Sequence, residues 1–203
     1  MLFKNKKILL VGLGVLGGGA ATANFLLREG ARLTITDLKS KNDLAKSLKK
    51  IKDIKKVKLV LGRHEEKDFH NNEIIVFNQS VPFESPWVKL AQKLKKPIES
   101  DLTLFSRLAR EYQADYIGIT GTRGKTTVSH WLHHFLPQSA LGGNIPNKGL
   151  SQIISPKNKL YALELSSFQL EFANASTLPP KIAIITNLGS SDPTPNLYAL
   201  ILR

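Results

Sequence analysis

The most informative segment of this 203-residue chain reads Thr120-Gly121-Thr122-Arg123-Gly124-Lys125-Thr126-Thr127. A short apolar run at residues 116–119 precedes it, and residues 125–135 follow it with a helical pattern. Glycines between a strand and a helix let backbone N–H groups converge on phosphate oxygens, and the helix N-terminus adds a favourable dipole. We therefore predict a strand–loop–helix unit that binds the phosphates of a nucleoside triphosphate.

Within this loop, Lys125 is placed to reach the β- and γ-phosphates, and Thr126 is placed to offer its hydroxyl to Mg²⁺. The strict G-x-x-x-x-G-K-[ST] pattern is not met, because Ile119 stands where the first glycine is expected. A purely structural turn could use the glycines, but it would not need Lys-Thr-Thr directly after them. The residues predicted to bind the nucleotide are Gly121, Thr122, Arg123, Gly124, Lys125, Thr126 and Thr127.

A second glycine-rich segment, Gly12-Leu13-Gly14-Val15-Leu16-Gly17, follows a predicted strand at Lys7–Val11 and precedes an alanine-rich helix. It fits G-x-G-x-x-G, and Asp37 lies roughly 20 residues further on, where a dinucleotide-binding domain has its ribose-binding acid. Three interpretations stay open: a tight packing turn, a nicotinamide dinucleotide site in an oxidoreductase, or a site for another nucleotide's diphosphate. The separate triphosphate loop favours the last one.

The order of the predicted elements indicates an α/β protein. Helices separate the first strand from strands at residues 32–36 and 57–61, and a fourth strand follows at residues 74–77. This β-α-β-α-β order predicts a Rossmann-like parallel sheet over residues 1–97. Residues 98–203 are predicted to form an incomplete P-loop-type ATPase domain, with a helix at 102–112 and strands at 116–119, 160–163 and 182–186. A helix at residues 87–94 is predicted to end the first domain.

Glu164 follows the predicted strand at residues 160–163, so its carboxylate is expected at the C-terminal edge of the second sheet, beside the phosphate loop. A divalent ion needs oxygen ligands at this position. An acidic residue at the end of a strand can equally be a solvated end or a helix cap, and both interpretations stay open. The five histidines show no spacing typical of a zinc site.

The composition excludes several classes of protein. There is no cysteine, which excludes disulfides and thiolate metal sites. With 42% hydrophobic and 22% charged residues, no long apolar run and no secretory signal, we expect a soluble, cytoplasmic protein without membrane insertion. The net charge of +13 comes largely from lysines at residues 39–67, on a predicted helix whose apolar side is Leu44, Leu48 and Ile51. Because no aromatic residues are interleaved, nucleic acid is not an expected partner.

Three motifs together resemble the Mur ligases of peptidoglycan synthesis. They are the loop at residues 121–127, then Gly142-Gly143-Asn144-Ile145, and then Glu164-Leu165-Ser166-Ser167-Phe168-Gln169-Leu170-Glu171. The last motif is most similar to the branch that adds D-glutamate to UDP-N-acetylmuramoyl-L-alanine. The resemblance covers residues 12 to about 187, roughly the first half of a full-length family member.

The resemblance implies that the first domain holds the uridine nucleotide of the substrate and that the second binds ATP with Mg²⁺. It implies catalytic roles for Lys125 and Glu164, and metal binding by Thr126 and Glu164. The residues implied to bind the substrate are Val15, Leu16, Gly17, Asp37, Asn144, Ser166 and Gln169. The implied reaction forms an acyl phosphate, which the amine of D-glutamate then opens to an amide.

The sequence departs from the family pattern in three places. Asn78-Gln79-Ser80 stands where the family has Ser-Pro-Gly, and Asp192 is followed by Pro193 in place of histidine. The sequence also ends before the family's carbamate-bearing lysine and its C-terminal domain. We therefore expect a truncated ligase that is inactive alone, with a non-catalytic nucleotide-binding module as the alternative. A monomer is expected at full length, whereas an unpaired sheet edge and the apolar residues 197–202 are predicted to promote association of this chain.

Overall fold

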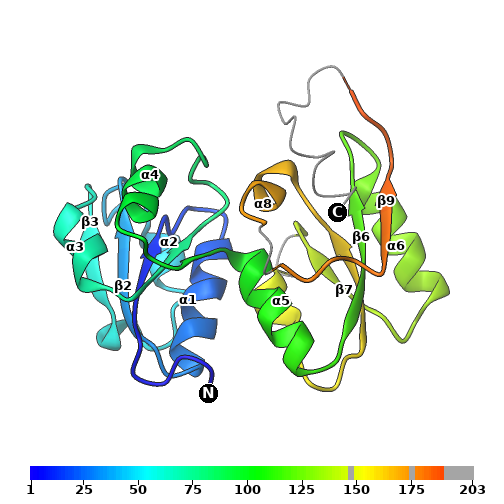
Figure 1. Cartoon of the computed structure of the whole chain (residues 1–203), viewed down its shortest axis with the longest axis horizontal. Helices are drawn as coiled ribbons and strands as arrows, with labels where there is room; N and C mark the ends of the chain where they lie inside the picture. The colour runs from blue at the N-terminus through cyan, green and yellow to red at the C-terminus, as the bar shows by residue number, and fades with distance from the viewer. Residues whose placement is uncertain (146–148, 174–176, 190–203) are drawn as a thin grey trace. The chain divides into compact units, whose positions relative to one another are not determined.

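The computed structural model describes residues 1–145, 149–173 and 177–189. The chain divides into two compact units, Met1–Asp101 and Leu102–Arg203. Each unit is an α/β structure with one parallel sheet (Figure 1). Within the described residues, no helix has the length and apolar character that crossing a membrane requires.

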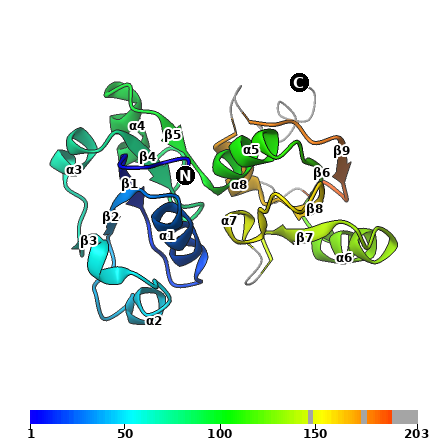
Figure 2. The ribbon, with the colours of Figure 1, turned by 90° about the horizontal axis from the view of Figure 1, so that it is seen from below.

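The first unit has a five-stranded parallel sheet in the order β3-β2-β1-β4-β5. Its strands are β1 (Lys7–Val11), β2 (Arg32–Asp37), β3 (Lys58–Leu61), β4 (Ile74–Phe77) and β5 (Ile98–Glu99). Its helices are α1 (Gly18–Arg28), α2 (Ala45–Leu48), the 3₁₀ turn η1 (Ile54–Lys56), α3 (Glu66–Asn71) and α4 (Pro86–Lys93). Figure 2 shows α1 and α2 on one face of this sheet and α3 and α4 on the other. This is the predicted Rossmann-like arrangement.

The core of the first unit lies around its central strand. Ile8, Leu9, Leu10 and Val11 of β1 are completely buried, as expected for a parallel strand covered by helices on both faces. The strand order reverses at β1, because the chain moves outward through β2 and β3 and then returns to the other side of β1 as β4. Loops that leave β1 and β4 in opposite directions open a crevice at their C-terminal ends.

The second unit has a four-stranded parallel sheet in the order β7-β8-β6-β9. Its strands are β6 (Asp115–Thr120), β7 (Ala140–Gly143), β8 (Leu160–Glu164) and β9 (Ile182–Ile185). Its helices are α5 (Asp101–Glu111), α6 (Lys125–Phe135), α7 (Leu150–Ile153) and α8 (Ser167–Glu171). Helices α5 and α6 lie on opposite sides of the sheet in both ribbon views (Figures 1 and 2).

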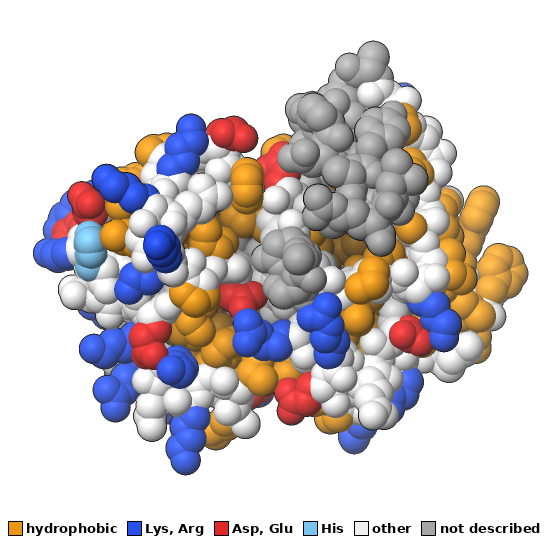
Figure 3. All heavy atoms as spheres, viewed as in Figure 1, with side chains coloured by type: hydrophobic (Ala, Val, Ile, Leu, Met, Phe, Trp, Pro, Cys, Tyr) orange, Lys and Arg blue, Asp and Glu red, His pale blue; other side chains and the backbone are white. Residues whose placement is uncertain are grey.

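Helix α6 has an outer face that is only partly covered. Trp131 and Phe135 are exposed, and hydrophobic side chains gather over α6 at the right edge of Figure 3. Strand β9 is an edge strand in the described part of the chain and leaves Ile182 largely exposed. The association predicted from such an edge stays a prediction, and the apolar residues 197–202 lie outside the described residues.

Most predicted elements have the predicted type, but one helix differs in length and several short elements were not predicted, among them helices α3, α7 and α8. The predicted lysine-rich helix is wrong in length, because the structure has only the short helix α2 followed by turns and η1. The Asn24 side chain of α1 donates to the Lys50 carbonyl and accepts from the Lys52 N–H, and both backbone groups would otherwise continue the helix. The predicted apolar side is confirmed, since Leu44, Leu48 and Ile51 are buried.

Two short strands were not predicted. Strand β7 contains Gly142 and Gly143, which have no side chain to show a strand pattern. Strand β5 follows Pro97 and pairs with β4, so the first unit extends to Asp101 and the division falls a few residues after the predicted boundary.

Candidate functional site

A pocket of about 310 Å³ opens in the first unit where the strand order reverses. It is lined by the glycine loop at residues 12–18, by the end of β2 at residues 37–39 and by residues 78–82 after β4. His64, Ser85 and Trp87 complete the lining. The volume is at the lower end of the range for small-molecule sites, and the position at a switch point is the usual one in doubly wound sheets.

Asp37 fixes the shape of the glycine loop. Its Oδ2 atom accepts hydrogen bonds from the backbone N–H groups of Leu13 at 2.8 Å and Gly14 at 2.9 Å. Its Oδ1 atom accepts from the N–H of Lys39 at 2.8 Å, and the residue is buried. Asp37 thus lines the pocket and also ties β2 to the loop, a structural role that the sequence interpretation did not include. Its contact with a substrate stays a prediction.

The glycine loop brings α1 close to the end of β1. Gly17 precedes α1 with φ of 97°, in the left-handed region that suits glycine. A Cβ atom on Gly19 would lie 2.3 Å from the carbonyl oxygen of Leu13, so only glycine fits there. Gly19 is outside the G-x-G-x-x-G spacing and was not identified from the sequence. Val15 and Leu16, predicted to bind substrate, are exposed at the pocket and leave their part of the loop open to a ligand.

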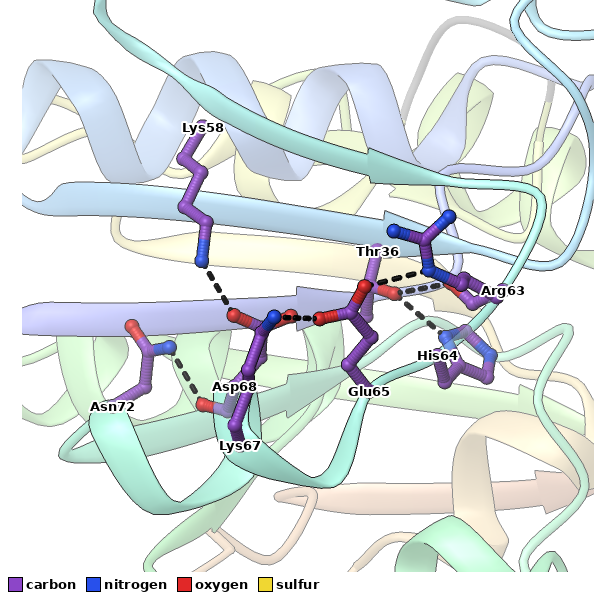
Figure 4. A network of polar contacts seen from close by, with 8 residues as sticks. All are labelled: Thr36, Lys58, Arg63, His64, Glu65, Lys67, Asp68 and Asn72. Atoms are coloured by element: carbon purple, nitrogen blue, oxygen red, sulfur yellow. Dashed lines mark hydrogen bonds and ion pairs between the residues drawn. The ribbon is translucent and has the colours of Figure 1, made fainter.

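His64 is a pocket residue that sequence reasoning treated as an ordinary histidine. Its Nδ1 atom is 2.8 Å from the Thr36 hydroxyl, which itself donates to the Arg63 carbonyl (Figure 4). A hydroxyl has one hydrogen, so His64 Nδ1 is the donor in their contact. Burial lowers the pKa of His64, and the nearby charge of Asp37 opposes this only in part. The ring packs edge-on against Trp87, with 5.1 Å between ring centroids.

The segment Asn78-Gln79-Ser80, one of the departures from the family pattern, also lines this pocket. The Asn78 side chain accepts a hydrogen bond of 3.0 Å from the Ser80 N–H, which closes a local turn. The segment therefore supplies polar side chains at the crevice although it lacks the Pro-Gly of the family.

The phosphate loop of the second unit joins β6 to α6 as predicted. Gly121 and Gly124 have φ of 130° and 80°, and Gly124 directly precedes the helix. A Cβ atom on Gly121 would lie 2.3 Å from the Thr186 hydroxyl, which shows how closely the segment after β9 approaches. Lys125 donates from Nζ to the carbonyl oxygens of Gly121 at 2.6 Å and Thr122 at 3.3 Å. Its ammonium therefore lies over the loop.

Residues 186–189 hold the loop from the β9 side. The Asn187 side chain accepts from the Arg123 N–H at 3.1 Å and donates to the Arg123 carbonyl at 3.0 Å. The Asn187 carbonyl accepts from the Thr122 N–H at 3.2 Å, and the Thr122 hydroxyl accepts from the Gly189 N–H at 2.8 Å. These contacts set the path of the loop before α6 begins. The neighbouring pair Asp192 and Pro193 lies outside the described residues.

Glu164 lies at the end of β8 beside the first turn of α6. Its Oε2 atom accepts a hydrogen bond of 2.6 Å from the Thr126 hydroxyl, and Oε1 accepts one of 3.2 Å from the Asn144 amide. The residue is only 3% exposed. Neither partner is charged, and no basic side chain forms an ion pair with Glu164 in the described parts of the chain. A buried carboxylate held by neutral donors fits a divalent cation, which would balance its charge.

Asn144 is brought to this site by β7. Gly143 has φ of 104°, and a Cβ atom there would lie 2.0 Å from the Glu164 carbonyl oxygen, so the two chains meet closely. The Asn144 N–H donates to that carbonyl at 2.8 Å. The structure thus brings together Thr126, Asn144 and Glu164, which the sequence places far apart.

Ser166 and Gln169 form a capping box at the start of α8. The Ser166 hydroxyl accepts from the Gln169 N–H at 3.3 Å, and the Gln169 side chain accepts from the Ser166 N–H at 3.0 Å. The reciprocal pair satisfies the first turn of the helix. Their predicted contact with a substrate stays a prediction. The predicted nucleotide contact of Thr127, which is exposed on α6, also stays a prediction.

These features define a protein with two parallel α/β units, one with a glycine-loop crevice and one with a glycine-rich loop between a strand and a helix. Comparison with known families gives two matches: residues 6–99 match the Mur ligase MurD-like N-terminal domain, and residues 119–191 match the Mur ligase middle domain. The chain therefore belongs to the Mur ligase family and contains these two domains.

Curated relatives agree with this assignment. The chain is 38% identical over 193 residues to the UDP-N-acetylmuramoylalanine–D-glutamate ligase of Roseiflexus sp. (strain RS-1), covering 93% of this chain and 41% of the relative. It is 39% identical over 192 residues to the enzyme of the same name from Borreliella burgdorferi (strain ZS7), and the match covers 91% of this chain and 40% of the relative. The chain thus spans about two fifths of the length of these relatives.

Solved structures support the fold. The UDP-N-acetylmuramate-alanine ligase MurC from Thermotoga maritima superposes with a TM-score of 0.56 at 21% identity, over 93% of this chain and 43% of that one. The MPL ligase from Neisseria meningitides gives a TM-score of 0.54 at 15% identity, and the superposition covers 97% of this chain and 65% of that one. At these identities the likeness concerns the fold alone.

Proposed function

We propose that this chain provides the nucleotide-binding parts of a ligase that joins D-glutamate to UDP-N-acetylmuramoyl-L-alanine, with ATP as the energy source. The first unit binds the uridine nucleotide, and the second binds ATP and Mg²⁺. The similarity to D-glutamate ligases supports the choice of substrates. The observation that carries the proposal is the arrangement of Lys125, Thr126 and Glu164 around one phosphate loop.

In this proposal the terminal carboxylate of the substrate attacks the γ-phosphorus of ATP, ADP leaves, and an acyl phosphate forms. The amine of D-glutamate then attacks the acyl carbon, and inorganic phosphate leaves as the amide bond forms. In this proposal Lys125 contacts oxygens of the γ-phosphate in place of the carbonyl oxygens of Gly121 and Thr122. The backbone N–H groups at the α6 N-terminus hold the remaining phosphate oxygens, because those of Thr122 and Arg123 donate to Asn187.

Thr126, Glu164 and the neighbouring Asn144 would form the cation-binding edge of this site. Bound Mg²⁺ would neutralise the phosphate oxygens and polarise the transferred phosphoryl group. The buried position of Glu164 keeps its carboxylate fixed, and the Thr126 hydroxyl is already within hydrogen-bonding distance of it. The hydroxyl and carboxylate oxygens proposed as cation ligands therefore lie side by side.

Isothermal titration calorimetry on the whole chain tests the proposal. We expect saturable binding of UDP-N-acetylmuramoyl-L-alanine and, separately, of a non-hydrolysable ATP analogue with Mg²⁺. Lys125→Ala should lower the affinity for the ATP analogue by about tenfold or more, because a charge-assisted contact to phosphate is lost. Lys181→Ala is the matched control, since Lys181 lies in the same unit and pairs on the surface with Asp115. Equal affinities for the two variants would overturn the ATP assignment.

Turnover separates a ligase from a nucleotide-binding module. Phosphate release that requires both UDP-N-acetylmuramoyl-L-alanine and D-glutamate supports catalysis by the chain. Binding of both nucleotides without such release supports the module.

A further inference from the structure

The segment that follows β9 controls the direction of two peptide groups in the phosphate loop. Strand β9 pairs in parallel with β6, and Ile185 lies opposite Thr120, so the chain leaves both strands at the same edge of the sheet. Residues 186–189 therefore run beside the loop that follows β6. Within this segment, the Asn187 side chain contacts the backbone of Arg123.

The Asn187 amide contacts both backbone polar groups of Arg123. Its Oδ1 atom accepts from the Arg123 N–H at 3.1 Å, and its Nδ2 atom donates to the Arg123 carbonyl at 3.0 Å. An amide side chain carries an acceptor and a donor, so one asparagine can satisfy both groups. A carboxylate of the same size could accept from the N–H but could not donate to the carbonyl. This contact therefore requires an amide.

The first of these bonds also sets the direction of the Thr122 carbonyl. The described residues contain no cis peptide bond, and in a trans peptide the C=O and the N–H point in opposite directions. Because the Arg123 N–H points to Asn187, the Thr122 carbonyl of the same peptide points away from Asn187. That carbonyl accepts from Lys125 Nζ at 3.3 Å, which agrees with this orientation.

The second bond sets the direction of the Gly124 N–H. The Arg123 carbonyl points to the Asn187 amide, so the Gly124 N–H of the same peptide points away from Asn187. Gly124 directly precedes α6, and its N–H has no hydrogen-bond acceptor among the residues that the structure describes. The open N–H and the Lys125 ammonium thus lie on the side of the loop away from Asn187. A phosphate group can accept hydrogen bonds from both.

We propose that Asn187 is a positioning residue for the nucleotide phosphates, because it orients the peptide groups on both sides of Arg123 so that the Gly124 N–H and the Lys125 ammonium face the same phosphate. The inference rests on the proposed function of the second unit as an ATP-binding unit. It adds a residue from outside the phosphate loop, one to which the family resemblance gave no role. Asn187 acts through the loop backbone and does not contact the nucleotide.

Calorimetry on the whole chain, with a non-hydrolysable ATP analogue and Mg²⁺, tests this role. Asn187→Ala should lower the affinity for the analogue by about tenfold, because the phosphate-binding groups lose their fixed orientation. Asn158→Ala is the matched control and should leave the affinity unchanged. Asn158 also donates from its side chain to a backbone carbonyl, that of Ile153 at 3.4 Å. It precedes β8, however, and so lies at the opposite edge of the sheet from the phosphate loop.

Amide proton resonances separate positioning from a general loss of stability. In the wild-type chain, saturating analogue should shift the Gly124 amide proton downfield, because this N–H donates to a phosphate oxygen. In Asn187→Ala the shift should be strongly reduced at saturation. The Arg123 amide proton should also exchange faster with solvent in this variant, because its acceptor is lost. The Thr122 N–H should stay protected, because it donates to the backbone carbonyl of residue 187.

Asn187→Asp is a second variant of nearly the same size. It keeps an acceptor for the Arg123 N–H but has no donor for the Arg123 carbonyl, so the Gly124 shift should be reduced in this variant as well. Urea unfolding shows whether each variant is folded, which we expect because Asn187 is exposed.

The outcomes distinguish the role of Asn187 from the ATP assignment. Equal affinities of the wild-type chain and Asn187→Ala overturn the role of Asn187 and leave the ATP assignment in place. A lower affinity with an unchanged Gly124 shift at saturation also overturns it, because the peptide group then keeps its direction without the asparagine. A wild-type chain that does not bind the analogue overturns the ATP assignment and the inference that rests on it.

Discussion

The hydroxyl of Thr126 lies 2.6 Å from the Oε2 atom of Glu164, although one residue is in the first turn of α6 and the other ends β8. The sheet makes this meeting possible, because β6 and β8 are adjacent and parallel and Ile119 pairs with Glu164. The loop that follows β6 therefore starts beside the end of β8. The pair combines a hydroxyl and a buried carboxylate at the predicted position of a divalent cation.

Glu164→Gln should remove the magnesium dependence of nucleotide binding. The amide is close in size to the carboxylate but lacks its charge, so the ATP analogue should bind with similar affinity in Mg²⁺ and in EDTA. The wild-type chain should bind it about tenfold more tightly with Mg²⁺. Calorimetry with and without Mg²⁺ measures this. If Glu164→Gln still binds the analogue about tenfold more tightly with Mg²⁺, Glu164 only accepts hydrogen bonds from Thr126 and Asn144 and does not bind the cation.

Gly19→Ala should destabilise the first unit, because the new Cβ atom would lie 2.3 Å from the Leu13 carbonyl oxygen. We expect a loss of about 1–3 kcal/mol in the free energy of unfolding, as for other overpacked sites. The neighbouring change Gly18→Ala is a sensitive control, since a Cβ atom there meets nothing within 4 Å. It should be neutral or slightly stabilising, because alanine favours the helix. Urea unfolding of both variants gives the comparison, and equal stabilities would contradict the close approach.

Asp37→Asn separates a structural role from a substrate contact. The carboxylate accepts three backbone N–H groups, and an amide cannot accept from all of them. We expect the free energy of unfolding to fall by about 1–3 kcal/mol, with weaker UDP binding as a consequence. Chemical unfolding measures the change in stability, and calorimetry measures the change in UDP affinity. Lost UDP binding at unchanged stability would instead identify Asp37 as a direct ligand contact alone.

Stability should depend on the protonation of His64. Burial lowers its folded-state pKa below the ordinary value of 6.5, so the unfolded chain takes up a proton at higher pH than the folded chain does. The stabilising contribution of neutral His64 is therefore complete above about pH 6.5 and decreases as the pH falls below it, through the folded-state pKa.

Urea unfolding as a function of pH measures this dependence. In His64→Gln, the free energy of unfolding should fall less steeply as the pH decreases below about 6.5. His70→Gln is the control, because His70 is at an exposed position on α3. The same decrease in the wild-type chain and in His64→Gln would show that other groups cause it.

The sequence was most informative where a backbone requirement leaves a residue signature. The loops at Gly12–Gly17 and Gly121–Gly124 were both predicted, since glycine is needed where φ is positive. In the second loop, Lys125 and Thr126 directly after the glycines added to the signal. The buried strands β1, β4 and β6 were predicted from their apolar runs. The short strands β5 and β7 were missed, because their pairing comes from neighbouring strands and not from a local pattern.

The sequence by itself determined that this chain has two parallel α/β units, each with a glycine loop between a strand and a helix, because these features depend on residues close together along the chain. Only the tertiary structure decided which distant groups meet: Asp37 with the Leu13 and Gly14 amides, Asn187 with the Arg123 backbone, and Thr126 with Glu164. Strand order and register bring these groups together, and they arise from packing across the whole sheet. Local sequence patterns do not contain that information.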